Sequence, residues 1–237
     1  MNLISGILFD KDGVFVDFEK TWAPVIHAMA VDLSMGDESL SSQLLDIAGY
    51  DRIAGVFLPG SVWGAGHADD LMEVWKPLLP AVHPDQLLVR ITDHCLRASA
   101  QPVFPLEKTR EIFSGLSAGD VKLGVATNDV TASAVRTVAE FGLSHLFDVV
   151  LGYDAVANPK PAGDPVLEFA ARTGIRPTQI MMVGDNLHDM QCGRAGGAGQ
   201  CVGVLSGNSS RADLEKLADH VIDDISQLPG LLAELGS

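Results

Sequence analysis

Hydrophobic and polar residues alternate in blocks that predict strands and helices in turn. Apolar runs of strand length alternate with segments whose apolar residues recur at helical spacing. The predicted strands are residues 4–9, 121–126, 149–151, 180–183 and 201–204, with 221–222 as a candidate edge strand. The predicted helices between the later strands are residues 106–116, 131–141 and 164–173. This βαβ rhythm predicts five or six mostly parallel strands covered by helices.

The segment after the first strand has a different pattern. Five apolar residues fall on one helical face: Trp22, Val25, Ile26, Met29 and Leu33. Helical-looking sequence continues to about residue 96, and no convincing strand interrupts it. The chain length of 237 residues fits a core with a smaller insertion. We therefore expect a mostly helical insertion between the first strand and the rest of the sheet.

Polar residues follow three of the predicted strands at the point where each strand ends. Asp10 follows the first run, Thr127 and Asn128 follow the second, and Asp185 follows the fourth. Ligands bind beyond the carboxyl ends of parallel strands, so these residues are expected to share one site. Asp10 and Asp12 leave the first strand on the same side, because side chains alternate with period two. Such a pair can divide nucleophile and proton-transfer roles if a cation screens the two charges.

Composition narrows the possible partners. The chain has 16 basic and 31 acidic residues and a formal charge of −15, which disfavours a nucleic acid partner. No apolar stretch has the length of a membrane span, and the amino terminus lacks the layout of a signal peptide, so we expect a cytoplasmic protein without membrane partners. Its three cysteines have no CxxC spacing, which indicates neither a disulfide framework nor a zinc site. An anionic substrate would need a local cation.

Four ordered motifs give the most specific signal. They are Asp10-Lys11-Asp12-Gly13-Val14, Thr127-Asn128, Lys160-Pro161 and Gly184-Asp185-Asn186-Leu187-His188-Asp189. In this order and approximate spacing the sequence resembles the haloacid dehalogenase-like superfamily, specifically its phosphatases with a helical cap, such as phosphoglycolate phosphatases. The resemblance implies an α/β fold with a Rossmann-like parallel sheet core, residues 1–15 and 91–237, and a helical cap domain, residues 16–90, inserted after the first strand.

The resemblance also assigns catalytic roles. Asp10 would be the nucleophile that forms an aspartyl-phosphate, and Asp12 would protonate the leaving alkoxide and then activate water. Thr127, Asn128 and Lys160 would bind the transferring phosphoryl group, with Lys160 supplying a positive charge. Stabilisation of charge is the main task in phosphoryl transfer.

By the same resemblance the cofactor is Mg²⁺, which prefers oxygen ligands. Asp10 and Asp185 would be its carboxylate ligands, and Asp12 would add its backbone carbonyl. Asp189 would bind the metal directly or through its water. His188 is left off this ligand set, because Mg²⁺ does not favour imidazole.

The family has branches with other chemistry. A phosphomutase uses the same core but returns the phosphoryl group to a sugar hydroxyl, and a noncatalytic binding protein could keep the fold. A dehalogenase lacks the second acid of the first motif, so Asp12 argues against that branch. An EF-hand loop starting at Asp10 would need Gly and Glu where Phe15 and Thr21 stand.

The favoured interpretation is a Mg²⁺-dependent phosphatase of a small phosphate monoester, acting as a monomer or homodimer. Phosphoglycolate is the first choice of substrate by resemblance, ahead of sugar phosphates and pyrophosphate. Arg52, Lys76 and Arg90 in the cap are candidate receptors for a substrate carboxylate, although surface placement is the default for each.

Overall fold

The computed structural model describes residues 4–65, 67–98, 106–119 and 121–236. The chain divides into two compact units, Met1–Asp17 with Pro105–Ser237 and Phe18–Phe104. The predicted boundary between residues 90 and 91 falls within helix α5, Pro84–Ala98, which belongs to the second unit. Helix α5 contacts α1 and α4 of the same unit, and its Leu87 and Ile91 are buried.

The first unit is built on a six-stranded parallel sheet, in the order β5-β4-β1-β6-β7-β8. The strands are β1 Gly6–Phe9, β4 Lys122–Ala126, β5 Val149–Leu151, β6 Ile180–Gly184, β7 Gln200–Val204 and β8 His220–Ile222. Strand β1 is central and fully buried, as its unbroken apolar run predicts for a strand of a covered parallel sheet. The α/β prediction is confirmed, including the candidate edge strand at residues 221–222.

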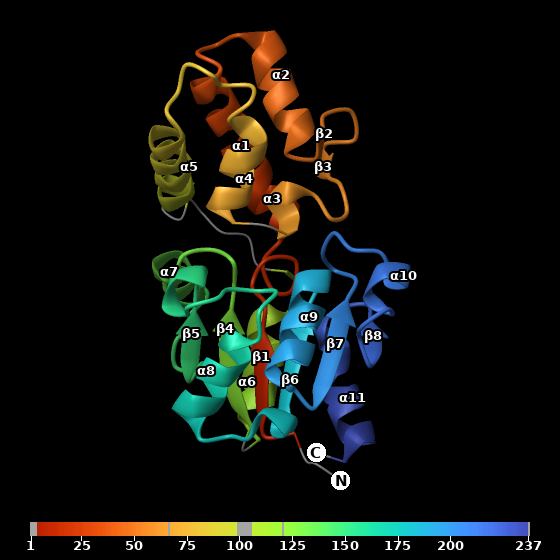
Figure 1. The fold of residues 1–237 in the computed structure, drawn as a ribbon. Coiled ribbons are helices and arrows are strands. Elements are labelled where there is room, and N and C mark those ends of the chain that lie inside the picture. Colours follow the sequence, from red (N-terminus) through yellow and green to blue (C-terminus); the bar gives the residue numbers. More distant parts are fainter. Residues whose placement is uncertain (1–3, 66, 99–105, 120, 237) are drawn as a thin grey trace. The chain divides into compact units, whose positions relative to one another are not determined.

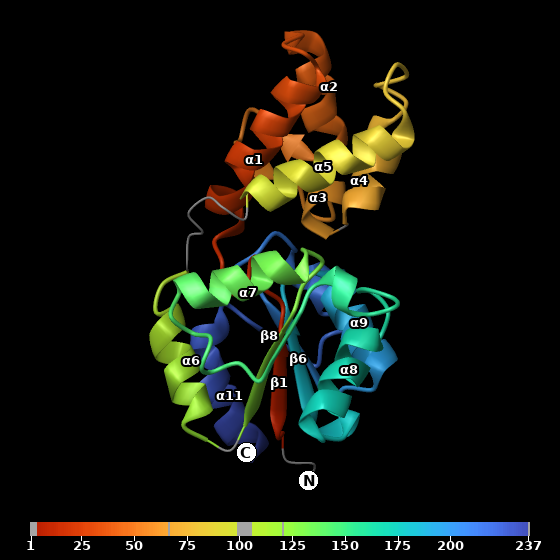
Figure 2. The same ribbon diagram turned by 90° about the vertical axis from the view of Figure 1, so that its left-hand side faces the viewer.

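Helices cover both faces of this sheet, with α6 and α11 on one side and α8 and α9 on the other (Figure 2). The helices of the unit are α6 Thr109–Ser117, α7 Thr131–Glu140, α8 Asp164–Thr173, α9 Leu187–Gly196, α10 Arg211–Leu214 and α11 Leu228–Leu235. Short 3₁₀ turns lie at Tyr153–Ala155, Pro177–Gln179 and Ile225–Gln227. Glycine at position 124 permits close packing of α8, because a Cβ there would lie 2.6 Å from the ring of Phe169.

Sheet register brings three strand ends to one level. Phe9 pairs with Val125 on one side and with Val183 on the other. The residues that follow these strands therefore emerge side by side at the carboxyl edge of the sheet. Figure 1 shows β1 between β4 and β6 in the middle of this unit.

The second unit is mostly helical. Its helices are α1 Phe18–Leu33, α2 Glu38–Ile47, α3 Val62–Ala65, α4 Ala68–Trp75 and α5 Pro84–Ala98. A hairpin of two short strands, β2 Tyr50–Asp51 and β3 Val56–Phe57, interrupts them, contrary to the expectation that this segment contains no strand. Two-residue strands give too few alternating positions to be recognised in a sequence.

The core of the helical unit is apolar and aromatic. Trp75 is fully buried, and its indole N–H donates to the Leu44 carbonyl at 2.9 Å. Phe57 contacts Phe18, Tyr50 and Trp63 through ring packing. Among the described residues, no helix of either unit is long and apolar enough to cross a membrane.

Candidate active site

Asp10 lies at the end of the central strand and is buried, with 7% of its surface exposed. Its backbone N–H donates to the Val183 carbonyl at 2.8 Å, which continues the pairing of β1 with β6. One carboxylate oxygen, Oδ1, accepts a hydrogen bond from the Lys160 ammonium at 2.7 Å. The strand end therefore fixes the backbone of Asp10, and Lys160 fixes its side chain.

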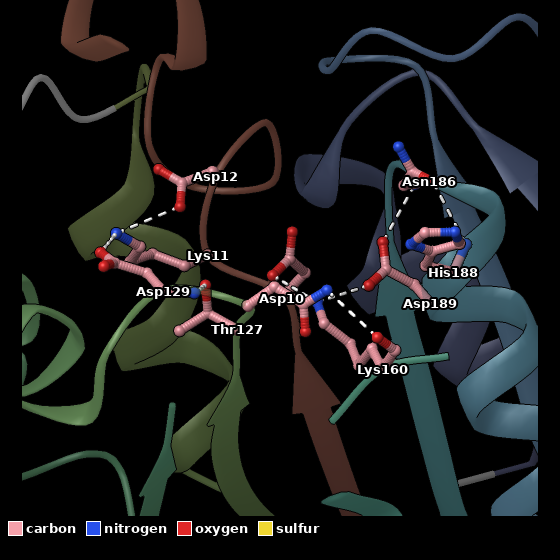
Figure 3. A network of polar contacts seen from close by, with 10 residues as sticks. Asp10, Lys11, Asp12, Thr127, Asp129, Lys160, Asn186, His188 and Asp189 are labelled. Atoms are coloured by element: carbon pink, nitrogen blue, oxygen red, sulfur yellow. Dashed lines mark hydrogen bonds and ion pairs between the residues drawn. The ribbon is translucent and has the colours of Figure 1, made fainter. Parts of the chain in front are cut away.

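Lys160 is a buried ammonium shared between two carboxylates. Its Nζ lies 2.7 Å from Asp10 Oδ1 and 2.6 Å from Asp189 Oδ1 (Figure 3). Burial lowers the pKa of Lys160, but the charges of Asp10 and Asp189 outweigh burial and raise the pKa above its ordinary value. Lys160 therefore carries a positive charge at neutral pH, next to the carboxylate that ends the central strand.

The ammonium of Lys160 compensates the negative charge of the Asp10 carboxylate only in part. The pKa of Asp10 is raised from 3.8 to about 7, chiefly by burial, and the nearby carboxylates of Asp189 and Asp12 contribute in the same direction. The Lys160 ammonium acts in the opposite direction without cancelling the shift.

Three carboxylates form a group that can hold a cation. Asp10, Asp185 and Asp189 each offer one oxygen, and these atoms lie within 4.8 Å of one another. Burial and the charges of Asp10 and Asp189 raise the pKa of Asp185 well above its usual range. Among the described residues, three buried carboxylates meet one ammonium in this cluster. The all-oxygen donor set and the excess negative charge fit a hard divalent cation such as Mg²⁺.

Two glycines form a close backbone cradle around Asp185. A Cβ on Gly207 would lie 1.9 Å from Asp185 Oδ2, and one on Gly13 would lie 2.7 Å from the same oxygen. The N–H of Asn208 donates to Asp185 Oδ2 at 3.1 Å, and the Ser206 hydroxyl donates to the Gly13 carbonyl at 2.7 Å. Sequence reasoning did not find the loop of residues 206–208, although a glycine just after a buried strand is a usable signal for close backbone approach.

The amino end of α9 fixes Asp189. Its Oδ2 accepts the backbone N–H of Asn186 at 3.0 Å, and the Asn186 side chain accepts the backbone N–H of Asp189, which together form a capping box. This exchange orients Asp189 Oδ1 toward Lys160. Asn186 Oδ1 also accepts the N–H of His188 at 3.2 Å. The side-chain nitrogen of Asn186 is buried and has no hydrogen-bond partner among the described residues, so a donor remains for a ligand.

Residues after β4 connect the strand end to Lys160. Thr127 is buried, and its Oγ1 accepts the N–H of Asp129 at 3.1 Å. The side-chain amide of Asn128 donates to the Lys160 carbonyl at 3.2 Å. The structure thus brings Thr127, Asn128 and Lys160 to the same edge of the sheet as Asp10.

Asp12 contacts a second buried lysine. Lys11 is only 1% exposed, and its Nζ lies 3.1 Å from Asp12 Oδ2 and 2.7 Å from Asp129 Oδ2. Figure 3 shows this group on one side of Asp10, with Lys160 and Asp189 on the other. Sequence reasoning missed Lys11 and Asp129, because residues 118 apart in the chain meet only in the fold.

The basic side chains of the helical unit are already paired. Arg52 donates to Asp46 at 2.8 Å, Arg90 donates to Asp32 at 2.8 Å, and Lys76 pairs with Glu73. All three lysine and arginine side chains are at least one-third exposed. Their surface placement agrees with the default expectation for each.

Comparison with known proteins gives the family. The haloacid dehalogenase-like hydrolase family matches residues 4–197. A phosphoglycolate phosphatase of Escherichia coli strain K12 is 31% identical over 215 residues, covering 82% of this chain and 79% of that protein. A phosphoglycolate phosphatase of Salmonella choleraesuis strain SC-B67 is 29% identical over 247 residues, covering 95% and 91% of the two chains.

Solved structures share the fold. A hydrolase from Pseudomonas syringae superposes with a TM-score of 0.71 at 20% identity and covers 98% of this chain and 100% of its own. The CbbY protein from Rhodobacter sphaeroides, solved in complex with phosphate, gives 0.68 at 16% identity and covers 95% and 96%. With the family match and the curated relatives, these findings show that the chain belongs to the haloacid dehalogenase-like hydrolase family and is an enzyme of its phosphatase type.

Proposed function

We propose that this chain is a Mg²⁺-dependent phosphatase that hydrolyses a small phosphate monoester, phosphoglycolate first, through an aspartyl-phosphate on Asp10. The observation that carries the proposal is the buried Asp10 carboxylate, 2.7 Å from the Lys160 ammonium and grouped with Asp185 and Asp189. A carboxylate that ends a central strand is held rigidly, and carboxylates are competent nucleophiles toward phosphorus. The four sequence motifs converge on it.

In the first step an oxygen of Asp10 attacks phosphorus, and the bond from phosphorus to the ester oxygen breaks. Asp12 gives its proton to the leaving alkoxide, which departs as an alcohol. In the second step the oxygen of a water molecule bonds to the phosphorus of the aspartyl-phosphate, the bond from phosphorus to the Asp10 oxygen breaks, and Asp12 takes a proton from that water. The products are inorganic phosphate and regenerated Asp10, so atoms and charges balance.

Asp10, Asp185 and Asp189 are the carboxylates that would hold Mg²⁺, and the backbone carbonyl of Asp12 would add a further oxygen. The bound ion supplies positive charge that offsets the phosphate and the clustered acids. Both oxygens of Asp189 already accept hydrogen bonds, from Lys160 and from the Asn186 N–H. We therefore favour contact of Asp189 with the metal through water.

Thr127, Asn128 and Lys160 are proposed to bind the phosphoryl oxygens. The hydroxyl of Thr127 and the N–H groups that follow β4 are donors, and Lys160 carries a permanent positive charge next to Asp10. Donors fixed by the fold before the reaction stabilise developing charge without reorganisation. The Asn128 contact to the Lys160 carbonyl keeps these two parts of the site together.

The helical unit, Phe18–Phe104, is proposed to be the cap that selects the leaving group. Phosphoglycolate is the first substrate to test, because the curated relatives above are phosphoglycolate phosphatases. A cap that excludes bulk water would also protect the aspartyl-phosphate until the second step.

Phosphate release tests the proposal. The panel contains phosphoglycolate, sugar phosphates, nucleotides and pyrophosphate, each with Mg²⁺ or with a chelator. Asp10→Asn should abolish release, and Asp85→Asn, a 91% exposed carboxylate in the helical unit, is the matched control with unchanged release. Isomerised sugar phosphate without free phosphate would instead identify a mutase. Release from no compound would favour a binding role.

A further inference from the structure

Lys11 occupies a buried position that would suit an apolar side chain. The three residues before Asp10 are fully buried and apolar, and Lys11 is itself 1% exposed, among the largest fully buried side chains. Burying an ammonium costs several kcal/mol unless carboxylates compensate it, and apolar replacements of such pairs are often neutral for stability. A buried lysine at this position therefore suggests a purpose beyond packing.

The partners of Lys11 come from two strand ends. Asp129 follows β4 and accepts from Lys11 at 2.7 Å, the shorter of the two contacts. Asp129 is itself fixed, since its N–H donates to Thr127 Oγ1 and its Oδ1 accepts the Val130 N–H at 2.7 Å. The ammonium is thus anchored on the loop that follows β4, and its Nζ also lies 3.1 Å from Asp12 Oδ2.

The charge of Lys11 is directed at carboxylates and away from solvent. Its Nζ is enclosed by the carboxylates of Asp12 and Asp129. With two carboxylates within 3.1 Å and 1% exposure, it presents little surface to a phosphate. Its effect on a reaction would therefore pass through Asp12.

We propose that Lys11, anchored by Asp129, is a positioning residue that holds the Asp12 carboxylate beside Asp10 for proton transfer. The inference rests on the proposed function, in which Asp12 is the general acid. It extends that function to two residues, Lys11 and Asp129, that come from different strand ends. Both are expected to matter most when the leaving group needs a proton.

Leaving-group dependence separates this role from a structural one. Phosphoglycolate expels a strongly basic alkoxide, whereas p-nitrophenyl phosphate expels a weakly basic phenolate that leaves without a proton. The ratio kcat/KM reports the first phosphoryl transfer, which both esters undergo at the same nucleophile. Loss of general acid catalysis costs about 10²- to 10⁴-fold, and a displaced acid should cost part of this.

The test measures kcat/KM for both esters in Lys11→Met and Asp129→Asn. We expect a loss of about tenfold or more with phosphoglycolate and less than about threefold with p-nitrophenyl phosphate, the pattern of Asp12→Asn in weaker form. Lys122→Met is the matched control, because Lys122 pairs with Asp148 at the opposite end of β4 and is 52% exposed. It should leave both ratios unchanged.

Equal losses with both esters would overturn the proposal, because a structural or phosphate-binding role affects them alike. Unchanged activity in both variants would overturn it as well. If Lys11→Met does not fold, Asp129→Asn alone tests the proposal. This substitution keeps the shape of the side chain and removes only the negative charge that holds Lys11. A wild-type protein that releases phosphate from no compound of the panel would refute the proposed function, whereas an active wild type with equal losses in the variants would overturn this inference alone.

Discussion

The excess of negative charge around Asp10 makes a prediction about stability as well as activity. In the absence of metal, Asp10→Asn should stabilise the protein at neutral pH while abolishing turnover. The asparagine keeps the side-chain volume and removes the charge of one of the three clustered buried carboxylates, two of which share the Lys160 ammonium. Most substitutions at a buried ion pair destabilise, so the expected sign is distinctive.

The magnitude follows from the pKa of Asp10. Its rise from 3.8 to about 7 is about 3 units, worth about 4 kcal/mol at 1.36 kcal/mol per unit. Between these two pH values the folded state binds more protons than the unfolded state, so wild-type stability falls as pH rises. The asparagine side chain does not titrate, so position 10 of the variant causes no such loss of stability as pH rises. The variant should gain up to about 4 kcal/mol over wild type at about pH 7.5, and about half of this at about pH 5.5.

Denaturant unfolding of both proteins in a chelator, at these two pH values, measures the difference. Asp85→Asn serves as the control for an exposed carboxylate and should change stability little. Saturating Mg²⁺ should then stabilise wild type, by about 2.7 kcal/mol at 100 times its dissociation constant, and the variant much less. A variant less stable than wild type at pH 7.5 without metal would refute the charge argument, because the Asp10–Lys160 pair would then outweigh the burial of Asp10.

Three further predictions follow from the same cluster. Lys160→Met leaves the carboxylates uncompensated, so metal-free stability should fall by about 3–5 kcal/mol and kcat by about 10²-fold or more. Denaturant unfolding and steady-state assays measure these two losses, and a variant as stable as wild type would contradict the prediction. Gly207→Ala places a Cβ 1.9 Å from Asp185 Oδ2 and should weaken Mg²⁺ binding about tenfold by calorimetry. Gly115→Ala, with no atom within 4 Å of the new Cβ, is its control, and equal affinities in the two variants would count against the cradle. Finally, Mg²⁺ affinity should fall up to about tenfold per pH unit below about pH 7, because protons compete at Asp10; a flat titration would show that Asp10 ionises normally.

The sheet and the main site residues could be predicted because each carries a local signal. Apolar runs mark the strands, and polar residues at their carboxyl ends identify the crest where Asp10, Thr127 and Asp185 meet. The residues that directly follow a strand end could therefore be grouped from the sequence alone.

The contacts that depend on tertiary structure could not be predicted in this way. Lys11 is a polar residue between two acids, and no periodic pattern in the sequence indicates its burial or its pairing with Asp129. Gly207 and Asn208 lie in a loop whose course sets their approach to Asp185. The short hairpin of the helical unit likewise has too few residues for alternation to be seen.

The central claim is that Asp10 carries the phosphoryl group during turnover. Borohydride reduction after rapid quench tags a phosphorylated aspartate, and peptide mass spectrometry locates the tag. With Mg²⁺ and phosphoglycolate in wild type, and most strongly with p-nitrophenyl phosphate in Asp12→Asn, because that leaving group needs no proton, we predict a tag on Asp10 that is absent without substrate or with a chelator. Turnover that persists in purified Asp10→Asn, or a tag on another residue, would contradict the covalent mechanism.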